Sequence, residues 1–341
     1  MRIGVLTSGG DCPGLNAVIR SVVHRAVDVH GDEVVGIEDG YLGLIEQRSR
    51  PLDHDDVQGL LTRGGTILGS SRVEPARIRR AVAEAPALAA ALGIDALIAI
   101  GGDGTFAAAQ LFCEAGLPVV GVPKTIDNDV NATDTSFGFD TAVSVATEAI
   151  DRLKTTAESH QRVMVVEVMG REAGWIALEA GTAGGAHGIL LPEKPFDIES
   201  VCVMIEERFA RGKKFAIVVA AEGARPAPGT LRLDPGVVDR YGHRRYGGIG
   251  TRLAQELEHW LGKESRPVIL GHIQRGGPPT ARDRVLATRF GWHAVEAVHK
   301  GASGYFTALR GTLVELMPIA DAIAEPKTVP RQRLLEAEAV L

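Results

Sequence analysis

Apolar, β-branched runs recur along the chain, and each ends in glycine or in a cluster of polar residues. Near-continuous apolar runs of this kind are typical of strands in a sheet that is covered on both faces. Between them, apolar residues recur at helical spacing, as in 15–26 and 143–153. Strands that alternate with helices predict an α/β fold with largely parallel sheets. The predicted strands are 3–10, 33–40, 95–105, 117–125, 162–170, 214–223 and 266–277.

The chain has 341 residues, of which 45% are hydrophobic, so we expect a globular protein of about two domains. No apolar run approaches the ~20 residues of a membrane span, and the first residues lack the pattern of a signal peptide. Cys12, Cys113 and Cys202 are scattered, which favours reduced thiols in a cytoplasmic protein. The net charge of −6 argues against a general nucleic-acid binder. The Pro-, Gly- and Arg-rich segment 223–248 is predicted to be a loop insertion.

Two predicted strands run into glycine-rich loops and then into helices: "TSGGDCPG", which contains Gly10, and "IAIGGDGT", which contains Asp103. Glycine lets the backbone approach a ligand closely, and the amides at a helix start favour phosphate. A carboxylate such as that of Asp103 would not help a loop to bind an anion by itself, but it suits a loop that holds Mg²⁺ against nucleotide phosphates. The alternatives are an ordinary turn for the first loop and a helix-capping aspartate for the second.

A third cluster, "PKTIDND", follows an apolar strand directly. Side chains alternate along an extended backbone, so Thr125, Asp127 and Asp129 would point the same way if the segment stays extended. One carboxylate would then accept a proton from an attacking hydroxyl, and another would hold a metal, as phosphoryl transfer requires. The alternative is an Asx-type turn that caps the helix expected near Asp140.

Basic residues lie beside glycines at the ends of other predicted strands, where arginine pairs well with phosphate. Each of them taken alone is also consistent with a solvated surface residue. Glu222, at the end of "AIVVAAEG", would accept hydrogen bonds from sugar hydroxyls or cap a turn. The basic candidates are Arg72, Arg77, Arg162, Arg171, Arg266, His272 and Arg275.

With these motifs in place, the chain resembles the phosphofructokinase family, bacterial 6-phosphofructokinases in particular. The resemblance implies two interleaved three-layer α/β/α domains with mostly parallel sheets. It implies a nucleotide-binding domain of 1–138 plus about 274–324, and a sugar-phosphate-binding domain of 139–273 plus about 325–341. The motifs, in the family's order, are "GGDCPGLNAVIR", "GYLGL", "GGTILGSSR", "GGDGT", "PKTIDND", "FGFDTA", "VEVMGREAGW", "AEG" and "GHIQRGG".

The resemblance also implies the activity, which is transfer of the ATP γ-phosphoryl to the 1-hydroxyl of fructose 6-phosphate. Asp127 would be the base, Asp103 and Asp129 would serve Mg²⁺, and Thr125 and Arg171 would contact the transferring phosphoryl group. The implied donor-site residues are Gly10, Asp11, Arg72, Val73, Gly102, Asp103, Gly104 and Thr105. The implied acceptor-site residues are Met169, Gly170 and Glu222 for the sugar, and Arg162, Arg266, His272 and Arg275 for its phosphate.

In this family the arginines that match Arg162 and Arg266 reach in from a neighbouring subunit, so the resemblance implies a homodimer or homotetramer with shared active sites. Well-known regulated members bind effectors between subunits. Here His24, His187 and Phe215 depart from that pattern, whereas Arg20, Arg211 and Lys213 fit it. We therefore expect a weak or absent response to ADP and phosphoenolpyruvate.

Two positions give opposite indications about the donor. Gly104 is typical of ATP-dependent members, since an aspartate there would add bulk and negative charge where the nucleotide α-phosphate passes. Lys124 is typical of pyrophosphate-dependent members. We favour ATP and keep pyrophosphate as the alternative. A different kinase with a GGDGT loop, such as an NAD or diacylglycerol kinase, and a non-catalytic sugar-phosphate sensor are more remote.

Overall fold

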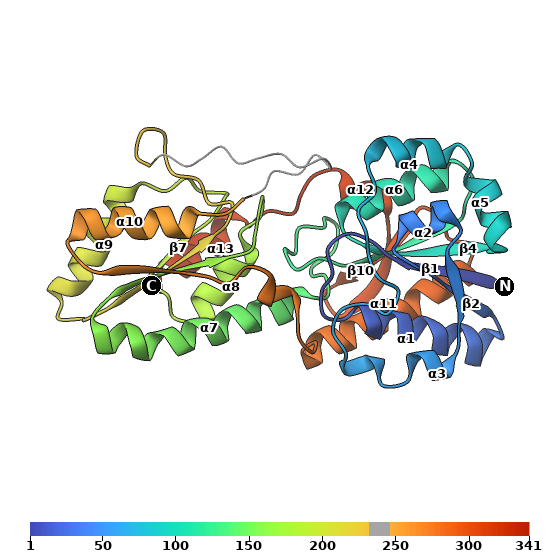
Figure 1. Cartoon of the computed structure of the whole chain (residues 1–341), viewed down its shortest axis with the longest axis horizontal. Helices are drawn as coiled ribbons and strands as arrows, with labels where there is room; N and C mark the ends of the chain where they lie inside the picture. Colours follow the sequence, from blue (N-terminus) through green and yellow to red (C-terminus); the bar gives the residue numbers. More distant parts are fainter. Residues whose placement is uncertain (232–245, 341) are drawn as a thin grey trace. The chain divides into compact units, whose positions relative to one another are not determined.

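The structure is a computed structural model that describes residues 1–231 and 246–340 (Figure 1). The chain divides into two compact units, one of Met1–Thr141 with Arg275–Pro326 and one of Ala142–Gln274 with Lys327–Leu341. Most of the loop insertion expected at 223–248 lies outside the described residues, which omit 232–245. Among the described helices, none is both long enough and apolar enough to cross a membrane.

The first unit is built on a seven-stranded sheet in the order β11-β10-β5-β4-β1-β2-β3. The strands from β10 to β2 in this order run parallel, which confirms the prediction of a largely parallel sheet. The two edge strands, β3 and β11, are antiparallel to their neighbours, and the sequence analysis predicted neither of them nor β10. The strands are β1 (Arg2–Thr7), β2 (Glu33–Ile37), β3 (Ser49–Leu52), β4 (Ala96–Gly101), β5 (Val119–Pro123), β10 (Tyr305–Arg310) and β11 (Leu313–Pro318).

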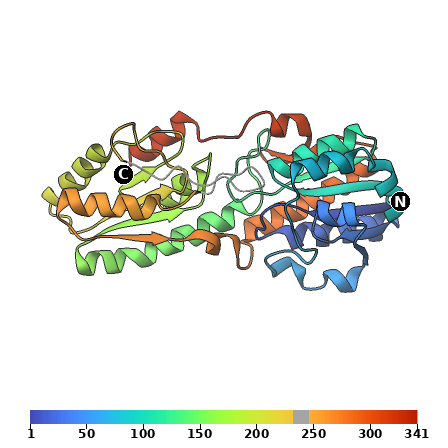
Figure 2. The same cartoon turned by 45° about the horizontal axis from the view of Figure 1, so that its top comes forward.

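Helices cover both faces of this sheet: α1 and α11 lie on one side, and α4, α5 and α6 lie on the other (Figures 1 and 2). Every residue of β4 is buried as a result, which explains its continuous apolar sequence. Phe106, Phe112 and Phe306 are fully buried in the core on the α6 side. The helices of this unit are α1 (Leu15–Arg25), η1 (Ala26–His30), α2 (Tyr41–Glu46), α3 (His54–Val57), η2 (Leu60–Thr62), α4 (Pro75–Val82), α5 (Ala85–Leu92), α6 (Asp103–Glu114), α11 (Ala281–His299) and α12 (Ile319–Ile323).

The second unit holds a four-stranded, fully parallel sheet in the order β7-β8-β6-β9. Helices α9 and α10 pack over one face, while α7 and α8 lie on the other (Figure 1). The strands are β6 (Val163–Val168), β7 (Gly188–Leu190), β8 (Ala216–Ala221) and β9 (Ser265–Ile269). The helices are α7 (Phe139–His160), which begins in the first unit, α8 (Trp175–Ala183), α9 (Ile198–Ala210), α10 (Ile249–Leu261), η3 (Gly271–Arg275) and α13 (Arg331–Glu338).

Helices α1 and α11 pack closely, because a Cβ atom added at Gly291 would lie only 2.7 Å from the Val18 carbonyl oxygen. Further along both helices, Arg25 Nε donates a hydrogen bond of 2.8 Å to Glu296, and His30 Nε2 lies 2.8 Å from the same carboxylate oxygen. The hydrogen bond from Arg25, with that of His30, lowers the pKa of Glu296 to about 2. An ion pair of partly buried groups therefore joins two elements that are distant in sequence.

Replacement of Glu296 by glutamine is expected to destabilise the protein by about 2 kcal/mol near pH 7, since the carboxylate has a lower pKa folded than unfolded. That contribution is complete above the unfolded pKa of ~4.3 and is lost as the pH falls towards 2. Urea unfolding of both proteins between pH 7 and pH 3 measures the difference. Glu315→Gln, at an exposed position of β11, is the matched control. A difference that did not shrink on acidification would contradict this role of Glu296.

Candidate active site

Two glycine loops meet at the carboxyl edge of the first sheet, because β1 and β4 are neighbouring parallel strands. The amide of Ser8 donates to the Ile100 carbonyl oxygen at 3.0 Å, and Thr105 Oγ1 donates to the Ser8 carbonyl oxygen at 3.3 Å. The loop that contains Gly10 and the loop that contains Asp103 therefore lie side by side. Both lead into helices, so their backbone amides suit an anionic ligand.

The second loop leaves open space at Gly104, where an added Cβ atom would have no neighbour within 4 Å among residues 1–231 and 246–340. Asp103 is the first residue of α6. Gly102, just before it, lies close to the Lys124 carbonyl oxygen, with 3.3 Å between that oxygen and an added Cβ. A side chain at position 104 would thus enter solvent or a ligand, and would not disturb the fold.

Arg275 lies against the first loop. Its Nη1 donates to the Asp11 carbonyl oxygen at 3.1 Å, and an added Cβ at Gly10 would lie 2.9 Å from the same nitrogen. The resemblance implies a sugar-phosphate contact for Arg275, and the structure places it beside donor-loop residues. Of the other implied donor-site residues, Arg72 is exposed and Val73 packs partly buried on the core. Arg77, a further basic candidate, is bound by Glu46 at 2.7 Å.

The "PKTIDND" segment does not continue as an extended strand. It bends at Ile126 and Asp127, and Asn128 has a left-handed φ of 53°. The spacing of two is therefore not what brings Asp127 and Asp129 together. Thr125 Oγ1 does this, because it donates to Asp129 Oδ1 at 2.8 Å and accepts from the Asp127 amide at 3.0 Å.

Asp127 is buried in this turn, with only 5% of its surface exposed, and Asp129 is partly buried. Burial, together with the nearby charges of Asp127 and Asp103, raises the pKa of Asp129 to about 6. Like charges that oppose one another's ionisation in a buried site are relieved by a bound cation. Carboxylate oxygens are also the ligands that Mg²⁺ takes in proteins. The residues present therefore fit a magnesium site.

Lys124 is buried beneath the first glycine loop, where its Nζ donates to the Gly10 carbonyl oxygen. Burial lowers the pKa of this lysine. Its ammonium group thus binds the backbone of the first glycine loop and lies near the place where donor phosphates are expected. Burial also raises the pKa of the neighbouring Cys12 thiol to about 12, which favours the protonated thiol over the reactive thiolate.

In the second unit, the loops after β6 and β8 pack directly on each other. The Gly223 amide donates to the Gly170 carbonyl oxygen at 3.0 Å, and an added Cβ at Gly223 would lie 1.8 Å from the Arg171 carbonyl oxygen. The Glu222 amide is bound to the Val168 carbonyl oxygen at 2.8 Å. Met169, Gly170, Arg171 and Glu222 are therefore brought to one edge of the sheet, as carboxyl ends of parallel strands require.

Gln274 supports the candidate site, although it was not among the predicted site residues. It is fully buried, accepts from the Met169 amide at 3.3 Å and donates to the Gly271 carbonyl oxygen at 3.0 Å. In this way it fixes η3, which carries the exposed His272, beside the end of β6. It stands inside the "GHIQRGG" motif, but an uncharged side chain offered no chemical signal.

Arg162 and Arg266 lie together at the other edge of the same sheet. Both bind Glu264, with 2.5 Å between Arg266 Nη2 and the carboxylate, and they stand at the amino ends of the neighbouring strands β6 and β9. A strand of six residues such as β6 spans about 17 Å. Within one chain the structure therefore brings these arginines to each other and not to Gly170 and Arg171.

The comparisons with known proteins all identify the same family. The phosphofructokinase family model matches residues 2–298. ATP-dependent 6-phosphofructokinase 2 of Streptomyces coelicolor is 68% identical over 100% of both chains. The pyrophosphate–fructose 6-phosphate 1-phosphotransferase of Amycolatopsis methanolica is 59% identical over 99% of both. The solved phosphofructokinase of Saccharomyces cerevisiae superposes with a TM-score of 0.83 at 31% identity, over 95% of this chain and 45% of that one. The chain belongs to the phosphofructokinase family.

Proposed function

We propose that this protein is an ATP-dependent 6-phosphofructokinase, which transfers the γ-phosphoryl group of ATP to the 1-hydroxyl of fructose 6-phosphate. The observation that carries the proposal is the buried turn after β5, in which Thr125 holds Asp127 and Asp129 together. A buried carboxylate beside phosphate-binding loops is what proton removal during phosphoryl transfer needs. A sensor that only bound ligands would have no use for this costly arrangement of like charges.

In the proposed reaction, Asp127 accepts the proton of the 1-hydroxyl as that oxygen forms a bond to the γ-phosphorus. The bond between this phosphorus and the β,γ-bridging oxygen breaks, and ADP leaves with the electron pair. Thr125 fixes the backbone of Asp127 through its hydrogen bond to the amide. Arg171 balances the charge of the phosphoryl group in transfer, as arginine does in phosphoryl-transfer sites.

The remaining groups bind and orient the substrates. The amides around Gly10 and Gly104 would hold the donor phosphates. Asp103 and Asp129 would hold Mg²⁺, which when bound offsets the negative charge of those phosphates. Met169, Gly170 and Glu222 would bind the sugar, and His272 would contact its phosphate together with Arg275. Orientation by these groups lowers the barrier by making the reaction effectively unimolecular.

The choice of ATP rests on Gly104. Open space at this position admits the α-phosphate and the nucleoside beyond it. Lys124 and the relative named for pyrophosphate favour the alternative donor. The Lys124 ammonium, however, is bound to the Gly10 carbonyl oxygen beneath the loop, where it does not obstruct a longer donor. Pyrophosphate thus remains the second candidate donor for the same acceptor.

The site would also need a second copy of the chain. Arg162 and Arg266 would bind the sugar phosphate in a neighbouring subunit, because within their own subunit they lie at the edge of the sheet away from Gly170 and Arg171. Glu264 keeps both guanidinium groups oriented in the single chain. We therefore propose a homo-oligomer with shared active sites.

The donor is tested by assaying the protein with ATP and with pyrophosphate separately, alongside Gly104→Asp and Gly104→Asn. Since no atom of the described residues lies within 4 Å of a Cβ added at this position, both variants should fold. Asparagine adds the same bulk without charge. We expect Gly104→Asp to lose at least about 100-fold in kcat/KM for ATP and Gly104→Asn to lose less. The reason is that the aspartate carboxylate and the α-phosphate of ATP would repel each other strongly in a poorly screened site. Normal ATP use by Gly104→Asp would refute the role assigned to this glycine.

Removal of the proposed base by Asp127→Asn should lower kcat by about 10²–10⁴-fold, the usual contribution of a positioned base. Binding of fructose 6-phosphate, measured by calorimetry, should stay within a few-fold of the native value. Asp151→Asn, on the exposed surface of α7, serves as the matched control and should leave both quantities unchanged. If turnover survived in Asp127→Asn, Asp127 would not be the base.

Shared sites predict complementation between two inactive variants. Asp127→Asn and Arg266→Ala should each have little activity alone, since each lacks one half of every site. Co-expressed at equal levels as a symmetric dimer, they should regain about a quarter of the native specific activity, because half of the dimers are mixed and each of these has one intact site. Absence of any recovery in hybrids isolated through two affinity tags would exclude sites shared through Arg266.

A further inference from the structure

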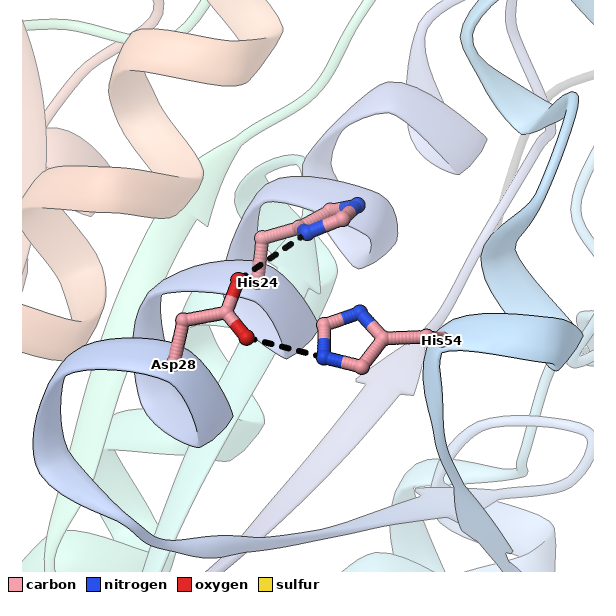
Figure 3. A group of neighbouring side chains, drawn as sticks. All are labelled: His24, Asp28 and His54. Atoms are coloured by element: carbon pink, nitrogen blue, oxygen red, sulfur yellow. Dashed lines mark hydrogen bonds and ion pairs between the residues drawn. The ribbon is translucent and has the colours of Figure 1, made fainter.

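Three potential metal ligands lie together on the first unit, and none of them belongs to the candidate active site: His24, Asp28 and His54 (Figure 3). His24 Nδ1 lies 3.3 Å from Asp28 Oδ2, and His54 Nε2 lies 2.9 Å from Asp28 Oδ1. One ligand atom from each side chain lies within 4.8 Å of the other two. The carboxylate stands between two imidazole rings that come from different elements.

The backbone holds the three residues in place without any ion. His24 belongs to α1, and Asp28 lies four residues later in the π-helical continuation η1, so the two share one helix face. His54 is the first residue of α3. Asp53 caps that helix by accepting from two backbone amides, and Asp56 returns a bond to the Asp53 amide at 3.1 Å. A π-helical turn within a longer helix is itself frequent at functional sites.

The spacing of the donors matches a small transition-metal ion. Zinc binds imidazole nitrogen and carboxylate oxygen at about 2.0–2.2 Å, so two ligands of a tetrahedral ion are about 3.3 Å apart. The separations of 3.3 Å from His24 to Asp28 Oδ2 and 2.9 Å from His54 to Asp28 Oδ1 are close to this value. Because the side chains are 38–50% exposed, small rotations would bring the two rings nearer to each other.

We propose that His24, Asp28 and His54 form a zinc-binding site. Two imidazoles and one carboxylate favour Zn²⁺ over Mg²⁺ and Ca²⁺, which prefer ligand sets made of oxygen alone. Three protein ligands leave a fourth position open for water or an exchangeable ligand. The ion would also connect α1 and η1 to the start of α3, and it would thereby restrain the segment between η1 and α3.

The alternative is a pair of hydrogen bonds between a surface carboxylate and two imidazoles, with no ion involved. Exposed ion pairs of this kind contribute little to stability, since water screens them and ordering the side chains has an entropic cost. The two accounts differ in one measurable way. A zinc site binds one ion per chain and loses it when any ligand is removed, whereas an ion pair does not respond to zinc.

The test is titration of the full chain with Zn²⁺ after dialysis against a chelator, followed by calorimetry or competition with a zinc-binding dye. Millimolar Mg²⁺ is kept present throughout to occupy sites made only of carboxylate oxygens. We expect one zinc per chain, with affinity reduced at least tenfold in His54→Gln and in Asp28→Asn. His259→Gln, an exposed histidine on α10, is the matched control and should bind zinc as the native protein does.

Further measurements distinguish loss of a zinc ligand from misfolding of a variant. Circular dichroism and the melting temperature without zinc should be similar for all variants, and His24→Gln, on the other element, provides a second ligand deletion. Zinc should raise the melting temperature of the native chain and leave His54→Gln unchanged, because a ligand stabilises only the state that binds it. Co²⁺ in place of zinc should give visible absorption that both histidine variants lose. Equal zinc binding by native protein, His24→Gln and His54→Gln would overturn the proposal.

Discussion

Like charges held together in a buried turn are the constraint around which the candidate site is organised. Asp127 and Asp129 follow β5 directly, and Asp103 adds a third charge from the start of α6. A buried carboxylate is costly unless it is hydrogen-bonded or paired with a cation. Thr125 offsets part of this cost through its hydrogen bond to the Asp129 carboxylate, and the repulsion that remains favours the binding of a cation or a proton.

The parallel sheets explain why the chemistry gathers at their edges. Parallel strands end at a common edge, so the loops after β1, β4 and β5 meet although they are far apart in sequence. By the same rule, Arg162 and Arg266 lie at the amino edge of the second sheet, opposite the carboxyl edge that carries Gly170 and Arg171. Strand direction alone therefore separates two groups of residues that the proposed reaction would need together, and a second copy of the chain would reunite them in the homo-oligomer we propose.

Donor choice depends on very little of this architecture. Relatives named for ATP and for pyrophosphate are 68% and 59% identical to this chain over nearly its whole length, so both donors are compatible with almost the same fold. We propose that two features, the open space at Gly104 and the buried ammonium of Lys124, provide the physical distinction. Specificity in such a site follows from a difference in a few contacts and not from the scaffold.

The sequence by itself determined the α/β class, most of the central strands and the glycine loops, because apolar runs and glycines are local signals. Together with the family's motifs it also pointed to Asp103, Asp127 and Asp129. Tertiary structure decided what depends on distant partners. The edge strands β3 and β11 form by pairing with neighbours, and Gln274 acts through hydrogen bonds across two loops. The grouping of Asp127 with Asp129 comes from a turn and a threonine, not from strand alternation. His54 meets Asp28 only because α3 packs beside α1, which no local pattern encodes.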